Sequence, residues 1–83
     1  VALEYASRKI RVNAVCPGFI ETPMLNRVTD ASVKIREHMI GTVPMRRVAE
    51  PSEIGEVAAW LMSDKSSYVT GVAMPVDGGW VAQ

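Results

Sequence analysis

The chain has 83 residues, 48% of them apolar, with nine basic and nine acidic side chains and a formal net charge of zero. This length permits at most one small domain, and zero net charge gives no electrostatic basis for binding nucleic acid or an anionic membrane. No apolar run approaches the roughly 20 residues of a membrane-spanning helix, and the single cysteine, Cys16, excludes an internal disulfide and predicts a reducing, cytoplasmic setting.

The first part of the chain predicts a helix end, a strand and a loop. Residues 1–6 are typical of the last turns of a helix, and because no capping residue precedes them we expect the chain to be cut from a longer protein. Residues 10–16 are rich in β-branched and small residues and predict a strand, although Arg11 and Asn13 interrupt it. Two prolines and a glycine in residues 17–23 predict an irregular loop.

Residues 24–40 predict one continuous amphipathic helix. Apolar residues recur at helical spacing, and charged residues occupy the other face. The apolar positions are Val28, Ala31, Ile35 and Met39. Gly41 and Pro44 end this helix.

A second helix and a second strand are predicted in the last part of the chain. The helix starts at Pro51, because proline is tolerated in the first helical turn, and either Glu50 or Ser52 caps it. Its apolar stripe is formed by Ile54, Val57, Ala58 and Leu61. Residues 72–76 predict a strand, in which Pro75 indicates a strand end or an edge strand.

The order of helix, strand, helix, helix and strand, closed by a turn at residues 77–79, predicts an α/β sheet. A strand–helix–strand crossover favours parallel pairing with a right-handed connection. Parallel strands need further strands beside them and helices on both faces, and the first strand alone would leave an open edge. We therefore expect the chain to be one part of a larger sheet.

Several sequence blocks carry a resemblance to a known family. They are residues 10–18 (IRVNAVCPG), the P-G-x-x-x-T pattern of residues 17–22, residues 44–54 (PMRR followed by EPSEI), residues 68–71 (YVTG) and residues 76–79 (VDGG). In this order they resemble the short-chain dehydrogenase/reductase family, and residues 2–6 (ALEYA) resemble the end of its catalytic helix. The resemblance implies a doubly wound, parallel-sheet Rossmann-like fold. Residues 1–83 would be the C-terminal segment of that single domain, with its last two strands and intervening helices, and without the N-terminal phosphate-binding and catalytic parts.

The same resemblance implies a nicotinamide site in the loop of residues 17–22. Ligands of open α/β sheets lie beyond the carboxyl ends of the strands, and this loop leaves such an end at Pro17. Gly18 has no Cβ, so a flat ring could approach its backbone. By resemblance, the backbone of Ile20 would hydrogen-bond the carboxamide, and Thr22 would contact the carboxamide or the diphosphate. Taken alone, Pro17 and Gly18 indicate a tight exit from a strand; together with the surrounding blocks they favour the cofactor interpretation.

No catalytic residue is assigned in this chain. Tyr5 and Lys9 fit the family's Y-x-x-x-K signature, but the family's functional pair lies several helical turns upstream of the ALEYA block. Tyr5 is therefore interpreted as a residue that packs between helix and sheet, with its hydroxyl at the surface. Asn13 is interpreted as satisfying nearby backbone groups, His38 as a solvated helix residue and Cys16 as a small buried hydrophobe.

No metal site or catalytic triad is assigned either. One histidine and one cysteine do not supply the ligand set of a zinc site. His38 with Asp64 and a serine at position 66 or 67 could be named as a triad, but their spacing does not support one.

The resemblance also implies a substrate lid and an oligomer interface. The helix after the cofactor loop is the family's variable lid, so Met24, Leu25, Val28 and Met39 could line a substrate pocket, although ordinary packing explains such a stripe equally well. Trp80 would be exposed here and fits a contact with a partner subunit. In some relatives the C-terminal tail, which here ends at Gln83, reaches toward a neighbouring active site or a metal ion.

The leading hypothesis is therefore part of an NAD- or NADP-dependent oxidoreductase that transfers hydride between the cofactor and a small carbonyl or alcohol substrate. This segment would supply the nicotinamide loop, the lid and the interface of a homo-oligomer, which is a tetramer by family resemblance. The alternative is a non-catalytic interaction or oligomerisation module that associates through Trp80 and its unpaired strands. The choice between NAD and NADP and the substrate stay open, because they depend on residues outside this chain or on a variable lid.

Overall fold

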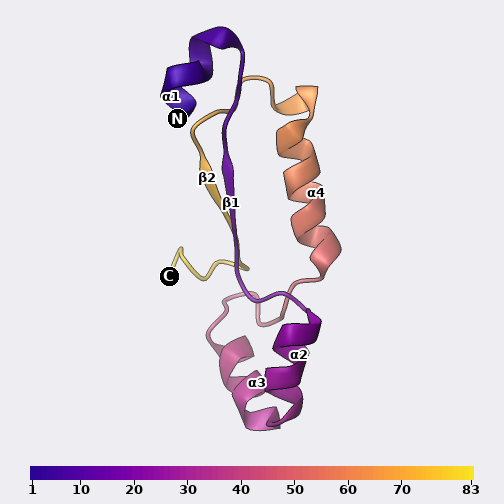
Figure 1. The fold of residues 1–83 in the computed structure, drawn as a ribbon. Helices are drawn as coiled ribbons and strands as arrows, with labels where there is room; N and C mark the ends of the chain where they lie inside the picture. Colours follow the sequence, from indigo (N-terminus) through magenta and orange to yellow (C-terminus); the bar gives the residue numbers. More distant parts are fainter.

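The computed structural model describes the backbone of residues 1–83 and the side chains of all residues except Val28 and Thr29. Its elements, in chain order, are α1 (Ala2–Tyr5), the 3₁₀ helix η1 (Ala6–Arg8), β1 (Ala14–Pro17), α2 (Pro23–Asp30), α3 (Val33–Gly41), α4 (Pro51–Met62), the 3₁₀ helix η2 (Asp64–Ser66) and β2 (Ala73–Val76). The molecule is elongated, at 50 × 26 × 20 Å, and α2 and α3 project beyond the carboxyl ends of the strands (Figure 1). Among the helices described, none combines the length and the apolar character needed to cross a bilayer.

β1 and β2 pair in parallel, as the predicted crossover requires. Ala14 lies opposite Ala73, and Pro17 lies opposite Val76. Both strands are shorter than predicted, because β1 begins at Ala14 and β2 begins at Ala73. Pro75, predicted at a strand end or on an edge strand, lies within β2.

Asn13 explains why the regular ladder begins late. Its Nδ2 donates to the carbonyl of Val69 at 3.1 Å, and its Oδ1 accepts from the N–H of Val72 at 3.1 Å. The side chain thus satisfies backbone groups that a longer ladder would have paired, which confirms the interpretation of Asn13. Regular backbone pairing begins one residue later, at Ala14.

Arg11 joins the approach to β1 with the end of α4. Its guanidinium donates to the carbonyls of Ser63 at 3.0 Å and Val69 at 3.2 Å, and to the hydroxyl of Ser66 at 3.1 Å. Ser66 is only 2% exposed, and its hydroxyl also donates to the carbonyl of Leu61 at 2.9 Å. The residue that interrupts the strand pattern therefore connects segments 52 to 58 positions apart in the sequence.

The prediction of one helix over residues 24–40 is wrong, because two helices, α2 and α3, occupy that region. Ser32 interrupts the helix with an extended backbone (φ −156°, ψ 115°), and its hydroxyl accepts from the N–H of Ile35 at 3.3 Å. Serine favours this role because its oxygen competes for backbone N–H groups. The single apolar face is not formed: Ala31 lies in the turn and Ile35 is 45% exposed, while the side chain of Val28 lies outside the described residues.

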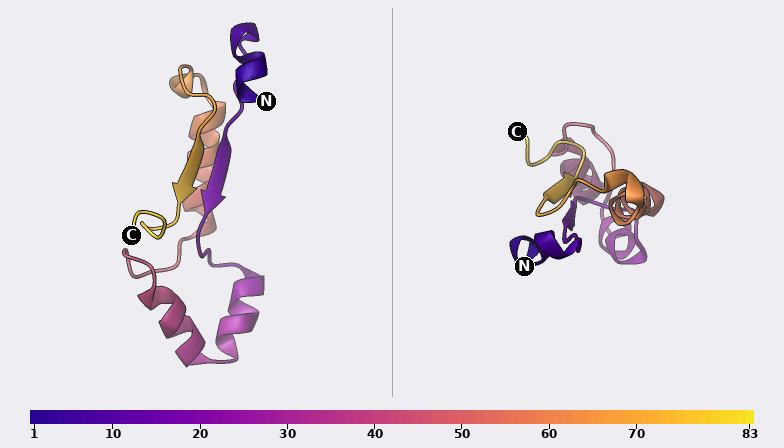
Figure 2. Two further views of the ribbon diagram at one scale, coloured as in Figure 1. Left: turned by 90° about the vertical axis from the view of Figure 1, so that its left-hand side faces the viewer. Right: turned by 90° about the horizontal axis from the view of Figure 1, so that it is seen from above.

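α4 begins at Pro51 as predicted, with Glu50 as its N-cap residue. Its apolar stripe faces inward: Leu61 is 6% exposed, and the stripe residues Ile54, Val57 and Ala58 are half-buried. Figures 1 and 2 show α4 running alongside the two strands. The crossover helix thus covers the sheet with the face that the periodicity indicated.

The turn predicted at residues 77–79 is also confirmed. Gly78 and Gly79 have φ angles of 64° and 95°, the left-handed region that favours glycine. A Cβ on Gly78 would lie 2.7 Å from Cγ1 of Val43, which is itself 3% exposed. The turn after β2 therefore closes directly over the segment that follows α3.

Candidate functional site

The loop after β1 and the turn after β2 meet at the carboxyl ends of the two strands. The N–H of Gly18 donates to the carbonyl of Val76 at 3.1 Å. A Cβ on Gly18 would lie 2.9 Å from both Cα and Cβ of Asp77, a distance that real Cβ atoms do not tolerate. The two chain segments therefore approach closely enough to require glycine here, independently of any ligand.

Ile20 is held at the edge of this loop by residue 49. The N–H of Ala49 donates to the carbonyl of Phe19 at 2.9 Å, and the N–H of Glu21 donates to the carbonyl of Ala49 at 2.8 Å, which makes an isolated parallel bridge between Ile20 and Ala49. The bonding groups come from the residues on either side of Ile20, so its own N–H and C=O point to the opposite edge of the loop. Within the described part of the chain these two groups have no hydrogen-bond partner. They can serve one donor and one acceptor of a ligand.

Thr22 caps α2. Its Oγ1 accepts from the N–H of Leu25 at 3.1 Å, and its carbonyl accepts from the N–H of Asn26 at 2.9 Å. A threonine hydroxyl both accepts and donates, so this cap orients the oxygen without using its hydrogen. The side chain is thus fixed at the start of the helix next to Ile20.

Pro17 is the last residue of β1, so the irregular loop begins at Gly18, one residue later than predicted. A groove of about 340 Å³ runs along the loop and the first turn of α2. It is lined by Gly18, Phe19, Ile20, Thr22, Met24 and Leu25. Of the predicted lid residues, the structure therefore brings Met24 and Leu25 to the loop, and the side chain of Val28 lies outside the described residues.

Glu21 binds α3 to the loop. Nη2 of Arg36 donates to Oε2 of Glu21 at 2.7 Å, with both side chains about one-third exposed (33% for Arg36 and 31% for Glu21). This hydrogen bond lowers the pKa of Glu21 and raises the pKa of Arg36. Sequence reasoning assigned neither residue a role, and no local pattern indicates the pair, because the partners lie 15 positions apart in different elements.

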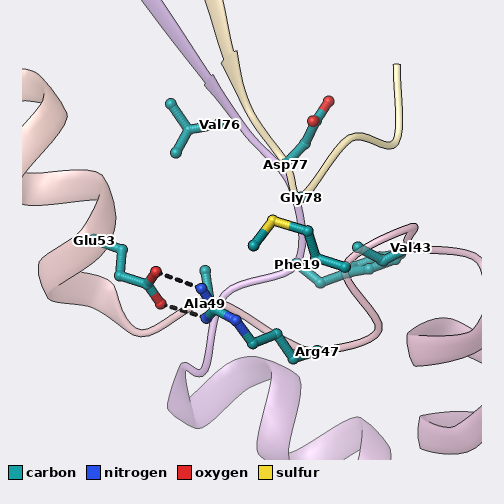
Figure 3. A pocket seen from close by; sticks show the side chains of 9 residues that line it. Phe19, Val43, Arg47, Ala49, Glu53, Val76, Asp77 and Gly78 are labelled. Carbon is teal, nitrogen blue, oxygen red and sulfur yellow. Dashed lines mark hydrogen bonds and ion pairs between the residues drawn. The ribbon is translucent and has the colours of Figure 1, made fainter. Parts of the chain in front are cut away.

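A second, smaller pocket lies behind the loop, between the turn after β2 and the start of α4 (Figure 3). It measures about 130 Å³ and is lined by Phe19, Val43, Met45, Arg47, Ala49, Glu53, Val76, Asp77 and Gly78. Arg47 donates two hydrogen bonds to Glu53, at 2.6 and 2.7 Å. The Arg47 hydrogen bonds, together with one from the N–H of Glu50, lower the pKa of Glu53 to about 2.

The prediction that Cys16 is buried is wrong, because the thiol is exposed. Successive side chains of a strand point to opposite faces of the sheet. The preceding residue, Val15, is half-buried, whereas Cys16 lies on the other side of β1. Its small apolar side chain could not indicate which face the strand would present to α4.

Tyr5 and Lys9 do not form the family's signature pair in this fold. Tyr5 ends α1, whereas Lys9 follows η1 with a left-handed φ of 61°, so the two residues do not share one helix. Tyr5 is 37% exposed, with the Arg8 guanidinium carbon 5.8 Å from its ring centre, and its packing between helix and sheet stays a prediction. α1 also lies at the opposite end of β1 from the loop of residues 17–22 (Figure 1).

The other residues considered as catalytic or metal-binding candidates do not come together in the structure. His38 is exposed on α3, far from Asp64 and Ser66, which lie in η2 beyond the other end of α4 (Figure 1). The side chains that the structure describes contain no group of three or more histidine, cysteine, aspartate or glutamate residues arranged to hold a metal ion. Trp80 is 50% exposed, and Nε2 of Gln83 donates to the carbonyl of Thr42 at 2.9 Å, so the tail lies against the end of α3.

Comparison with known proteins identifies the family. A family profile described as enoyl-(acyl carrier protein) reductase matches residues 1–81. A solved short-chain dehydrogenase family protein from Francisella tularensis has a TM-score of 0.87 and 37% identity, over 99% of this chain and 37% of that one. The chain belongs to the short-chain dehydrogenase/reductase family. The family and the fold class implied by the sequence blocks, part of a Rossmann-like parallel sheet, are confirmed.

Two further relatives extend the comparison of this short-chain dehydrogenase/reductase chain. It is 46% identical to oxidoreductase UcpA of Escherichia coli strain K12 over 84 residues, which cover 95% of this chain and 32% of the relative. It is 49% identical to the 3-oxoacyl-[acyl-carrier-protein] reductase FabG of Thermotoga maritima over 80 residues, 96% of this chain and 31% of the relative. The chain therefore spans about a third of the length of these relatives.

One structural relative was solved with a nucleotide. This Agrobacterium tumefaciens protein, a candidate 2-deoxy-D-gluconate 3-dehydrogenase with bound NADP, has a TM-score of 0.89 and 34% identity. The match covers 99% of the short-chain dehydrogenase/reductase chain and 33% of that protein.

Proposed function

We propose that this chain is the C-terminal segment of a single Rossmann-like domain in an NAD- or NADP-dependent oxidoreductase. The complete enzyme would transfer hydride between the cofactor and a small carbonyl or alcohol substrate. The outward-facing backbone groups of Ile20, beyond the carboxyl end of β1, carry the proposal, because ligands of such sheets bind there. Membership of the family and the relative solved with NADP support it.

Ile20 would orient the nicotinamide end of the cofactor. When bound, the nicotinamide ring supplies or accepts the hydride. A carboxamide at the loop would accept from the N–H of Ile20 and donate to its C=O, and two bonds at fixed spacing hold a planar group in one orientation. Since the bridge to Ala49 fixes the peptide groups on both sides of Ile20, this orientation is set before the ligand arrives.

Thr22 would hold the cofactor with its hydroxyl hydrogen. The hydrogen bond from the N–H of Leu25 occupies one lone pair of Thr22 Oγ1. The hydroxyl hydrogen is not used in this bond and can be donated to a ligand. The hydroxyl can donate to the carboxamide oxygen or to a diphosphate oxygen. Pro17 and Gly18 would bring the backbone of the loop close to the ring, because the tight contact of Gly18 with Asp77 fixes its position.

The other parts of the segment have proposed roles around this loop. The groove beside Met24 and Leu25 would face the substrate, with α2 and α3 as the lid, and exposed Trp80 would contact a partner subunit in a homo-oligomer. The alternative, a non-catalytic module, requires the 83 residues to fold alone. Few large apolar side chains are buried among those described, with Val43 and Leu61 as the core, which weighs against that alternative.

Substitution of Thr22 in the complete protein tests the proposed function. We expect Thr22→Val to weaken binding of NADH or NADPH about fivefold, the effect of losing roughly 1 kcal/mol from one hydrogen bond, and Thr22→Ser to restore it. Nicotinamide fluorescence titration measures both. Ser32→Ala is the matched control, because it removes a helix-capping hydroxyl at a position outside residues 17–22.

Binding of a second ligand, ADP-ribose, distinguishes the two possible contacts of the Thr22 hydroxyl. If the hydroxyl binds the carboxamide, affinity for ADP-ribose, which lacks nicotinamide, stays unchanged in Thr22→Val; if it binds the diphosphate, that affinity falls as well. The absence of saturable binding of either dinucleotide to the wild-type protein would contradict the proposed function.

A further inference from the structure

Next to the proposed nicotinamide loop, an ion pair between Arg47 and Glu53 bends residues 47–53 into a corner at the start of α4. Nη1 and Nη2 of Arg47 bind Oε1 and Oε2 of Glu53 at 2.6 and 2.7 Å (Figure 3). Oε1 of Glu53 also accepts from the N–H of Glu50 at 2.9 Å, and the N–H of Glu53 donates to the carbonyl of Glu50 at 2.9 Å. The carboxylate of Glu53 therefore holds both the side chain of Arg47 and the backbone of Glu50, on either side of Ala49.

Ala49 lies within this corner, and its backbone faces the loop. Both its N–H and its C=O are bonded to the loop, at Phe19 and Glu21 respectively. These are the two peptide groups that flank Ile20, so a displacement of Ala49 would move both. The position of the Ile20 backbone therefore depends on the corner that Arg47 and Glu53 close.

The exposure of Arg47 and Glu53 limits how much their ion pair contributes to the overall stability of the fold. The side chains of Arg47 and Glu53 are 48% and 39% exposed. Ion pairs in such surroundings contribute little to the overall stability of a fold, whereas a two-pronged guanidinium–carboxylate contact restricts the geometry of its partners. The effect of this pair should accordingly be local to residue 49 and the loop that it holds.

We propose that Arg47 and Glu53 are positioning residues for the nicotinamide end of the cofactor, acting through Ala49 on the backbone of Ile20. The inference rests on the proposed function, because it requires a nicotinamide at the loop of residues 17–22. It assigns to the start of the crossover helix a role in cofactor orientation, and neither residue need touch the ligand.

A double-mutant cycle in the complete protein tests this role. Arg47→Ala and Glu53→Gln each remove the ion pair, and glutamine keeps an oxygen that can accept from the N–H of Glu50. We expect each variant to weaken NADH or NADPH binding about two- to fivefold, the fold-change that corresponds to one exposed ion pair, and the double variant to be no weaker than either. Arg47→Lys should recover part of the loss, because it restores the charge without the planar fork.

A ligand without nicotinamide separates positioning from general damage. Affinity for ADP-ribose, or for its 2′-phosphate if the protein prefers NADPH, should stay at the wild-type value in all variants. Lys65→Ala, which removes an exposed cation beyond the other end of α4, serves as the matched control and should leave every affinity unchanged.

The outcomes distinguish this inference from the function on which it rests. If the wild-type protein binds neither dinucleotide, the proposed function fails. If it binds one of them and the variants bind it equally well, the positioning role alone is overturned. Equal losses for the dinucleotide and for ADP-ribose would show that the pair only supports the fold and would also overturn the role.

Discussion

Gly18 and Gly55 differ in the space around them: a Cβ would clash at Gly18 and would meet no atom at Gly55. Gly18 packs against Asp77, where the loop after β1 meets the turn after β2. Gly55 lies in the exposed part of α4, and a Cβ there would meet no atom within 4 Å. The sequence assigned Gly18 to ring approach or to a tight exit from a strand; its packing against Asp77 depends on a residue 59 positions away, which no local pattern indicates.

Substitution of these two glycines should have opposite effects on stability. Gly18→Ala would place a methyl group 2.9 Å from the backbone of Asp77, so we expect the free energy of unfolding of the complete protein to fall by about 1–3 kcal/mol. Gly55→Ala should raise it by about 0.5–1 kcal/mol, because alanine loses less backbone freedom in a helix. Urea unfolding of both variants measures the difference. A Gly18→Ala variant as stable as the wild type would show that the two segments are not packed as described.

At the scale of elements, the spacing of apolar residues predicts one of the helical regions correctly and the other wrongly. α4 was predicted correctly because its apolar stripe and its proline start agree with each other. The helix over residues 24–40 was predicted wrongly because the apolar spacing outweighed Ser32, whose side chain caps a new helix. The structure also adds the pairs that tie these helices to the loop, Arg36 with Glu21 and Arg47 with Glu53, which no helical spacing indicates.

The start of α4 should lose its ion pair in acid. The pKa of Glu53 is about 2 in the folded chain, compared with about 4.3 for an unfolded chain, so the stabilisation it provides is fully present above about pH 4.3 and is lost as the pH falls toward 2. We expect Glu53→Gln to have a slightly lower urea midpoint than the wild type near neutral pH, because the pair is half-exposed, with the difference shrinking as the pH falls. Glu56→Gln, which removes a carboxylate from the same helix without touching Arg47, controls for net charge. Parallel midpoint curves for the wild type and Glu53→Gln would contradict this prediction.

At the scale of the whole molecule, the described chain has a thin core. Val43 and Leu61 are its buried apolar residues among those described, and many large apolar side chains are exposed. β1 and β2 form a sheet of only two strands, whereas parallel sheets are normally covered on both faces. This arrangement fits a chain that spans about a third of its relatives.

The 83-residue chain on its own should therefore not unfold cooperatively. Too little apolar surface is buried to offset the loss of conformational freedom. Thermal circular dichroism and size-exclusion chromatography of the isolated chain measure this. A sharp transition with a discrete oligomer would instead support the non-catalytic module.

The sequence by itself determined the family, the parallel sheet, the crossover helix and the place of the loop, because these depend on patterns within short segments and on blocks in a fixed order. The cytoplasmic setting, the oligomer and the roles of Pro17, Gly18, Ile20 and Thr22 remain predictions. The tertiary structure alone decided which face Cys16 occupies, that residues 24–40 form two helices, and that Ala49 holds Ile20. Such contacts join segments distant in sequence, and their free energy depends on geometry that exists only after the chain has folded.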